Sequence, residues 1–150
     1  MDVQAIAQAL AARYAPANVT PPSGLTNIRL STERLPDFIS MPPTVLVFPP
    51  ESQFTYTPGS RQSAQDWFIR FYEAQVTGPG RTVERLYQWY SVLIGQLLPN
   101  SQLGQSGSGG VATATIVGAR IGTLTYGEVE FQGIEMVARV RLAEGINPVA

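Results

Sequence analysis

The residues of this chain that could do chemistry are carboxylates and arginines near its C-terminal end. Glu128 and Glu130 are two residues apart, so on an extended backbone both side chains point to one face. Such a pair could act in acid–base catalysis or hold a hard cation. The same alternation is typical of the solvated face of an ordinary strand, and Arg139 and Arg141 fall on that face too. We therefore favour cross-strand or intersubunit ion pairing as the use of these four charges.

Two residue types that most often carry chemistry are missing. The chain has no cysteine and no histidine, which excludes disulfides, thiolate nucleophiles, His-based zinc sites and Ser-His-Asp catalysis. The glycine-rich stretch 100–110 lacks a following Lys-Ser/Thr and does not lie between a strand and a helix, so it does not fit a phosphate-binding loop. We predict no catalytic residue, no cofactor and no metal site, and we expect that the protein is not an enzyme.

Length and composition favour a single domain that spans residues 1–150. The net charge of −1 gives no electrostatic footprint for nucleic acid or membrane. Charged residues make up only 14%, which fits either a surface partly hidden in an oligomer or a domain solvated by Thr, Ser and Gln. No apolar run approaches the length of a membrane span and no signal peptide is visible, so we expect synthesis in a cytoplasm.

The element around which the chain is organised is a predicted amphipathic helix over 82–98. Its apolar residues recur at helical spacing and define one face that a sheet can cover; they are Val83, Leu86, Tyr87, Tyr90, Leu93, Ile94 and Leu97. Trp89 lies off this stripe, so we expect it to face a partner. Pro99 and Asn100 end the helix.

Most of the remaining apolar runs are short and strand-like. Residues 2–14 predict a first helix, and strands are expected at 25–33, 44–48, 53–57, 63–77, 111–121 and 124–142. Strand 63–77 is apolar on both faces, so we expect both to be covered, one by the central helix and the other by the first helix or a neighbouring subunit. The phase of the last strand changes at Gly133, as a β-bulge requires. The prediction is an α+β domain with a largely antiparallel sheet, an N-terminal helix and one long amphipathic helix packed on it, and a flexible loop at 100–110.

The order of these elements resembles that of tail terminator proteins of long-tailed, siphovirus-type bacteriophages. The matching parts are the helix MDVQAIAQALAARY, the strand run RLSTERLPDFISMPPTVLVFPP, the hairpin at TPGS, the strand DWFIRFYEAQV, the helix TVERLYQWYSVLIGQLL and the closing strands LTYGEVEFQGIEMVARVRL. The similarity covers most of the chain and lies in the order and texture of its elements.

The resemblance implies a structural virion protein whose copies form a homohexameric ring on the last ring of the tail tube. The ring would end tube elongation and present the surface for head attachment, at the head-proximal end of the tail. Its partners would be its own copies, the tail tube protein and a head–tail connector protein, with no membrane involved. DNA would pass through the lumen without specific recognition. The family has no catalytic residues to carry over.

Ring closure needs two different patches on one chain. Our interface candidates lie on a hairpin tip, on the glycine-rich loop and on the charged strand face; they are Phe54, Tyr56, Pro58, Arg61, Gln102, Gln105, Gly109, Glu128, Glu130, Arg139 and Arg141. Two alternatives stay open. One is another head–tail connector component, such as a stopper or head-completion protein. The other is a monomeric α+β module that binds a small ligand between helix and sheet.

Overall fold

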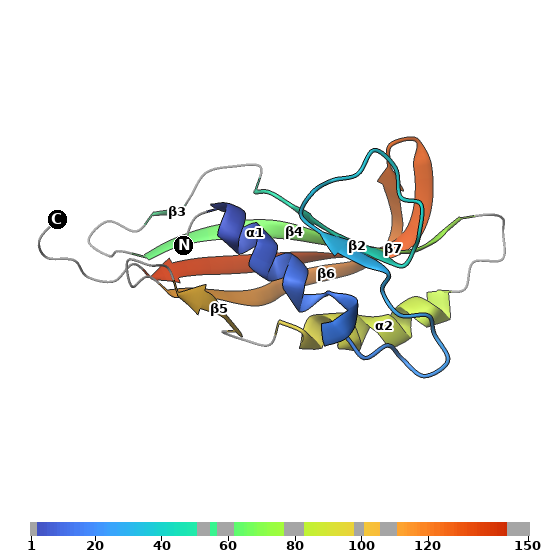
Figure 1. Cartoon of the computed structure of the whole chain (residues 1–150), viewed down its shortest axis with the longest axis horizontal. Coiled ribbons are helices and arrows are strands. Elements are labelled where there is room, and N and C mark those ends of the chain that lie inside the picture. The colour runs from blue at the N-terminus through green and yellow to red at the C-terminus, as the bar shows by residue number, and fades with distance from the viewer. Residues whose placement is uncertain are drawn as a thin grey trace, which may run out of the picture.

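The computed structural model describes residues 3–50, 55–56, 62–76, 83–97, 101–105 and 111–143, which form one sheet and two α-helices (Figure 1). The helices are α1 (Val3–Arg13) and α2 (Val83–Gly95), and a 3₁₀ turn, η1 (Pro16–Asn18), follows α1. The strands are β1 (Leu30–Thr32), β2 (Thr44–Phe48), β3 (Thr55–Tyr56), β4 (Gln62–Gln75), β5 (Ser101–Gln105), β6 (Val111–Tyr126) and β7 (Val129–Ala143).

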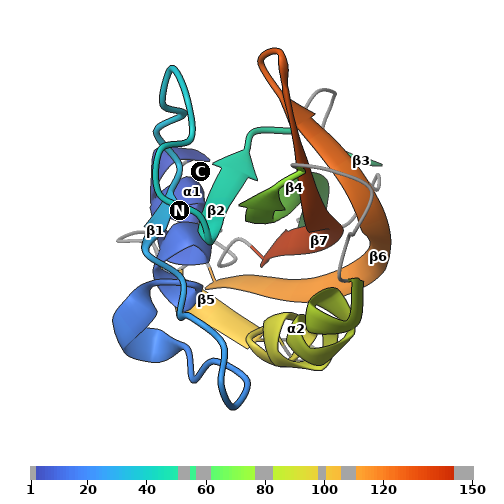
Figure 2. The same ribbon diagram turned by 90° about the vertical axis from the view of Figure 1, so that its right-hand side faces the viewer.

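Within these residues the strand order is β1-β2-β4-β7-β6-β5, and β3 pairs with β4 beside this path. The β1–β2 pair is parallel and every other described pair is antiparallel. The strands form an open sheet on which α1 and α2 pack (Figure 2). This confirms the predicted α+β class with a largely antiparallel sheet.

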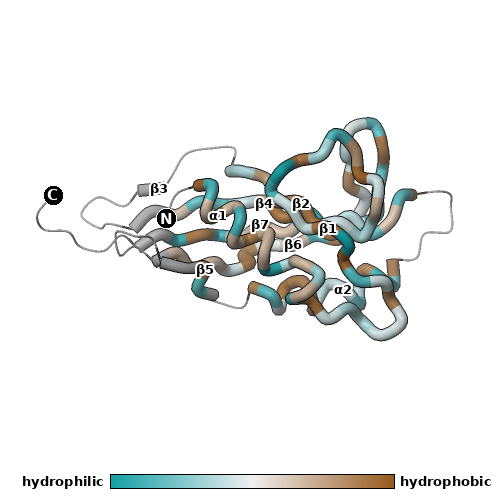
Figure 3. Tube along the Cα trace, viewed as in Figure 1, coloured by the Kyte–Doolittle hydropathy of each residue, from teal (hydrophilic) through white to brown (hydrophobic). Residues whose placement is uncertain are grey.

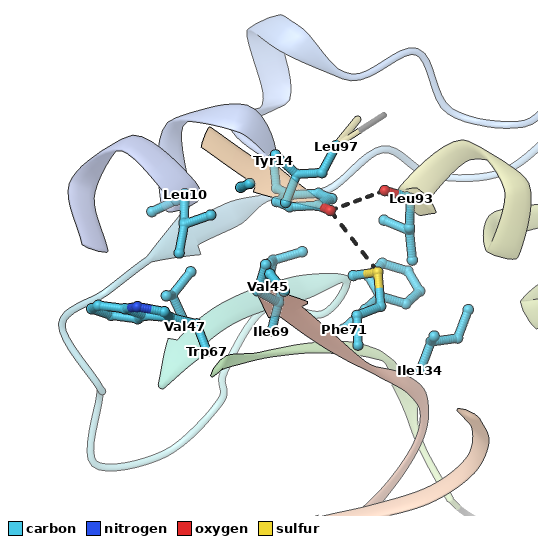
Figure 4. Close-up of a cluster of buried hydrophobic side chains, with 14 of the residues drawn as sticks. Leu10, Tyr14, Val45, Val47, Trp67, Ile69, Phe71, Leu93, Leu97 and Ile134 are labelled. Carbon is cyan, nitrogen blue, oxygen red and sulfur yellow. Dashed lines mark hydrogen bonds between the residues drawn. The ribbon is translucent and has the colours of Figure 1, made fainter. Parts of the chain in front are cut away.

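The main core lies between the two helices and one face of the sheet (Figure 4). The strands contribute every second residue to it, as a period of two requires; these residues include Val45, Val47, Trp67, Ile69, Phe71, Ile134 and Met136. From α1 come Ile6 and Leu10, so the first helix covers the same face as α2. The suggestion that the first helix covers the second face of the long strand is therefore wrong.

Tyr14 joins the two helices inside this core. Its hydroxyl donates a hydrogen bond to the Leu93 carbonyl of α2 at 2.9 Å and lies 3.9 Å from the Met136 sulfur (Figure 4). The side chain is fully buried, and burial raises the pKa of Tyr14 far above its ordinary value. The phenol is therefore protonated at neutral pH and acts as a hydrogen-bond donor.

A second, smaller cluster covers part of the opposite face of the sheet. It consists of Leu46, Tyr72, Leu124 and Phe131, with Ile39, Phe48 and Tyr126 packed against it. The Tyr72 ring meets Tyr126 and Phe131 edge-on, at centroid distances of 5.8 and 5.4 Å. Residues 33–43, here called the connector, rise on the same side as the β6–β7 hairpin (Figures 1 and 2), and the Tyr126 hydroxyl donates to the Pro36 carbonyl.

Helix α1 lies against both outer strands of the sheet. At one edge the Arg13 guanidinium donates to the Gln102 carbonyl of β5. At the other edge the Ser31 hydroxyl of β1 donates to the Ala11 carbonyl at 2.6 Å. Exposed strand edges invite pairing with another chain. Since α1 lies beside β1 and β5, association by simple addition of a strand is hindered at these two strands.

The buried face of α2 differs from the predicted one. Leu86, Trp89, Leu93 and Leu97 are fully buried, whereas Tyr87 is 62% exposed. The Trp89 ring packs on Phe71 with centroids 4.9 Å apart. The expectation that Trp89 faces a partner is thus wrong: the indole buries more apolar surface than a tyrosine, and a tyrosine can keep its hydroxyl in water.

Two further predictions need correction. Residues 101–105 of the predicted flexible loop form edge strand β5, because β6 supplies hydrogen-bond partners for a backbone whose side chains give no strand pattern; residues 106–110 lie outside the described part. The predicted bulge at Gly133 is also displaced, since β7 stays in register with β6 there and the irregularity lies in β4 between Tyr72 and Ala74. Phe131 and Ile134 differ in phase because they serve clusters on opposite faces.

Gly133 sits where β7 approaches β4 most closely. A Cβ atom at this position would lie 2.1 Å from the Phe71 carbonyl oxygen and 2.9 Å from Leu124 Cδ1. The first of these neighbours is backbone and cannot rotate away. Only glycine therefore fits between the main core and the second cluster.

We predict that Gly133→Ala lowers the free energy of unfolding by about 3 kcal/mol, because the added methyl group forces β4 and β7 apart. Denaturant unfolding followed by the fluorescence of Trp67 and Trp89 measures it. Gly118→Ala is the matched control, since a Cβ there meets nothing within 4 Å, and we expect it to change the free energy by less than about 0.5 kcal/mol. Equal stability of the two variants would contradict the close approach.

Candidate functional site

The four predicted strand charges do not form one site. Glu128 lies in the β6–β7 turn and Glu130 is the second residue of β7, opposite Thr125, whereas Arg139 lies nine residues further along the strand. At roughly 3.3 Å per residue this places the glutamates about 30 Å from the arginines. Glu130 and Arg139 also differ in parity along a strand without a bulge, so they point to opposite faces. The predicted shared face is therefore wrong.

The other interface candidates are only partly described. Phe54, Pro58, Arg61 and Gly109 lie outside the described residues. Tyr56 is in β3 and Gln105 in β5, where only their backbone pairing is described. Gln102 is exposed on β5, and its carbonyl accepts the hydrogen bond from Arg13.

The structure instead brings together a row of ion pairs on the sheet face opposite the helices. Arg70, Glu135 and Arg120 are directly opposite one another on β4, β7 and β6. Glu135 accepts from Arg70 at 2.7 Å and from Arg120 at 3.2 Å. The Arg70 guanidinium also lies 4.5 Å from the centroid of the Phe48 ring. One carboxylate thus holds two cations in place across three strands.

The same face continues toward the C-terminal end of β7. Arg139 makes a two-point contact with Asp66, Nε to Oδ1 at 2.9 Å and Nη2 to Oδ2 at 3.2 Å. Arg141 is exposed and makes no ion pair within the described residues. Among the described residues of β4, β6 and β7, this face therefore carries four arginines against two carboxylates, although the chain as a whole has a net charge of −1.

A second polar site lies at the irregularity of β4, on the helix side of the sheet. The Glu73 side chain is 9% exposed; one of its oxygens lies 3.0 Å from Arg85 Nε, and it accepts a hydrogen bond from the Gln132 amide. Beside this pair opens a cleft of about 250 Å³ whose walls include Leu25, Arg29 and Trp89. The cleft lies between α2, the end of β4 and the loop that precedes β1.

Local sequence spacing could not have revealed this cleft. Arg29, Glu73 and Arg85 are far apart in the sequence and no motif links them. The one available signal is Glu73 itself, a carboxylate inside a strand that is apolar on both faces, where an ion needs a partner. Which arginine would meet Glu73 could not be judged without the fold.

The acidic side chains of the described residues bear on whether a metal ion or a catalytic acid could be held there. No cluster of three or more Asp or Glu side chains able to hold a metal ion occurs among them. Glu135 accepts from two arginines, which favours its ionised carboxylate and works against a role as proton donor. No helix within the described part of the chain is long and apolar enough to cross a membrane.

Glu135 should make the stability of the fold depend on pH. Burial alone would raise the pKa of Glu135, but hydrogen bonds from Arg70 and Arg120 and their charges outweigh it and hold that pKa below its usual range. The carboxylate therefore ionises more readily in the folded protein than in the unfolded chain. Its contribution is complete above the unfolded value of roughly 4.3 and is lost as the pH falls through the folded value.

We predict that Glu135→Gln lowers the free energy of unfolding by about 1–2 kcal/mol at pH 7, because two arginines lose their charged acceptor. The difference from the unsubstituted protein should shrink as the pH falls below about 4. Denaturant unfolding at a series of pH values measures both effects. Glu128→Gln, at an exposed position without a described ion pair, serves as control. A loss that does not change with pH would contradict the role of the charge.

Comparison with known proteins leaves this geometry as the main basis for a functional argument. A scan against protein-family models finds none that matches the chain, and a search of curated proteins finds no match either.

Proposed function

We propose that this protein is the tail terminator subunit of a long-tailed bacteriophage. Its copies form a closed ring, a hexamer by resemblance, on the last ring of the tail tube. The ring ends elongation of the tube and offers its other side to a head–tail connector protein, and DNA passes through the lumen without specific recognition. The proposal rests on the order of the elements and on the surfaces that the fold leaves open.

The observation that carries the proposal is the presence of large apolar side chains at the surface on two sides of the sheet. Phe38 of the connector is 70% exposed and Met41 is 53% exposed, and on α2 Tyr87 is 62% exposed. The connector and α2 lie on opposite sides of the molecule (Figures 1 and 2), and hydrophobic residues are interspersed with hydrophilic ones along both (Figure 3). Exposed apolar groups of this size are typical of protein–protein contact surfaces.

Separate apolar surfaces suit a ring subunit better than a self-contained binding module. A subunit of a closed ring contacts two neighbours through different patches. A tail terminator would in addition contact the tail tube protein and the head–tail connector protein. Because α1 lies against both sheet edges, these contacts would be made by side chains. The small-ligand alternative is less well supported, since the cleft of about 250 Å³ is smaller than ordinary ligand pockets of roughly 300–1,000 Å³.

The position of the protein in the virion tests the proposal. Because the chain has no cysteine, a single Gln8→Cys substitution at an exposed position of α1 takes one gold or maleimide label. We expect electron microscopy to show the label in one ring at the head-proximal end of the tail. Binding to purified tails rather than to DNA-filled heads would distinguish a terminator from a stopper. Label along the tail shaft, or none in the virion, would refute the proposal.

We also predict that Phe38→Ser produces overlong tails, because the substitution removes a phenyl group from the proposed contact surface. The isolated protein should keep its free energy of unfolding within about 0.5 kcal/mol, because this side chain is exposed. Tail lengths in electron micrographs and the unfolding midpoint measure the two effects. Val3→Ser, at a residue 45% exposed on α1, is the matched apolar control and should leave tail length unchanged. Tails of normal length from both variants would show that residues 33–43 are not part of the contact surface.

A further inference from the structure

The β6–β7 turn forms a projecting acidic tip, which we define as residues 127–130. Gly127 has a φ of +63°, as such a tight turn requires, and Glu128 and Glu130 are exposed. Neither glutamate makes an ion pair within the described residues. Val129 between them is 36% exposed. The tip thus presents one apolar side chain flanked by two uncompensated negative charges.

The base of this tip is held in place. Tyr126, the last residue of β6, donates its hydroxyl to the Pro36 carbonyl and meets Tyr72 edge-on. The hairpin therefore rests on the connector and on the second cluster. A binding group that is held before contact loses less conformational entropy on association.

The cleft beside Glu73 has the complementary character. Arg29 lines it, is exposed and makes no ion pair within the described residues. Arg85 lines it too, and its partner Glu73 leaves the cleft with one positive charge in excess. Leu25 and Pro42, which are partly exposed, supply the apolar wall, and the buried Pro43 and Trp89 line the cleft as well. At roughly 30 Å³ per water molecule, a volume of about 250 Å³ has room for one or two side chains.

One chain cannot place its own tip in its own cleft. The tip rises on the connector side of the molecule, whereas α2 lies across the sheet from it in both views (Figures 1 and 2). A contact between tip and cleft must therefore join two copies. It would use different patches on the two copies, which is the heterologous arrangement that generates rings.

We infer that the tip of one copy docks into the cleft of the next, with Val129 against the apolar wall and the glutamates facing Arg29. The partner is a second copy of this chain, chosen because the charges of the two surfaces are opposite and because the glutamates of the tip and Arg29 of the cleft make no ion pair within the described residues. This inference rests on the proposed ring and names the contact that builds it.

Cysteine cross-linking tests the contact, because the natural chain has no background thiol. We mix chains carrying Val129→Cys with chains carrying Thr26→Cys, whose exposed side chain lines the cleft, and oxidise them mildly. Disulfide-linked dimers of one chain of each kind are expected. Val129→Cys mixed with Gln8→Cys is the matched control and should give none above background. Equal yields from the two mixtures would overturn the inference.

Charge exchange tests the recognition. Adding Glu130→Arg to the Val129→Cys chain should lower the cross-linking yield about tenfold, and adding Arg29→Glu to its partner should restore much of it. Both side chains are exposed, so folding is not at stake. A yield that ignores the first substitution, or a loss that the second one fails to rescue, would show that another contact brings the two cysteines together and would overturn the inference.

A chain with both cysteines separates a ring from a reciprocal dimer. Head-to-tail docking predicts a ladder of cross-linked chains that closes at the ring size, whereas a product that stops at two chains overturns the inference. Failure of the proposed function is read separately. Label at the head-proximal tail end without cross-linking would refute this contact and leave the proposed function standing. Cross-linking by a protein that never joins a tail would support the contact and refute the role as a tail terminator.

Discussion

The close approach of β7 to β4 at Gly133 is the constraint on which the rest of the structure depends. With the Phe71 carbonyl oxygen 2.1 Å from where a Cβ would be, the two strands meet without a side chain between them. On one side of this point the Phe71 ring packs on Trp89 of α2, and on the other Leu124 belongs to the second cluster. The sheet can therefore carry an apolar layer on each face because its central pair closes tightly there.

Burying both faces determines what remains for contact with other molecules. The helices fill one face, the connector and the hairpin fill part of the other, and α1 lies against the outer strands through Arg13 and Ser31. What is left is a set of side-chain surfaces: an arginine-rich row held by Glu135, a cleft beside Glu73 and apolar groups on α2 and the connector. These surfaces are suited to recognition by shape and charge, as the proposed ring contacts require.

The sequence predicted the fold well where a period of two or 3.6 was strong. Val45 and Val47, and Trp67 with Ile69, alternate clearly, and their strands formed as expected. The apolar pattern does not predict which way α2 faces, because it counts tyrosine as apolar although its hydroxyl can stay in water. The pattern therefore places Tyr87 in the core, where the structure has Trp89. Strand β5 was missed because an edge strand takes its hydrogen bonds from its neighbour and needs no pattern of its own. The cleft joins residues distant in sequence, which no local spacing reports.

The tip also bears on how such a subunit avoids association in the wrong place. An exposed valine on a hairpin can associate with apolar surfaces without selectivity. The two glutamates beside Val129 make such contacts unfavourable unless a cation pairs with them. Within the described residues, Arg29 combines an uncompensated charge with an apolar wall, whereas the arginines at 70, 120 and 139 are already paired. Arg141 is uncompensated as well, but the hollow beside it, lined by Val117 and by threonines, is far smaller, at about 20 Å³. Discrimination between these two arginines would therefore come from the size of the cleft beside the first, so that the cleft selects the site and the charge orients the tip within it.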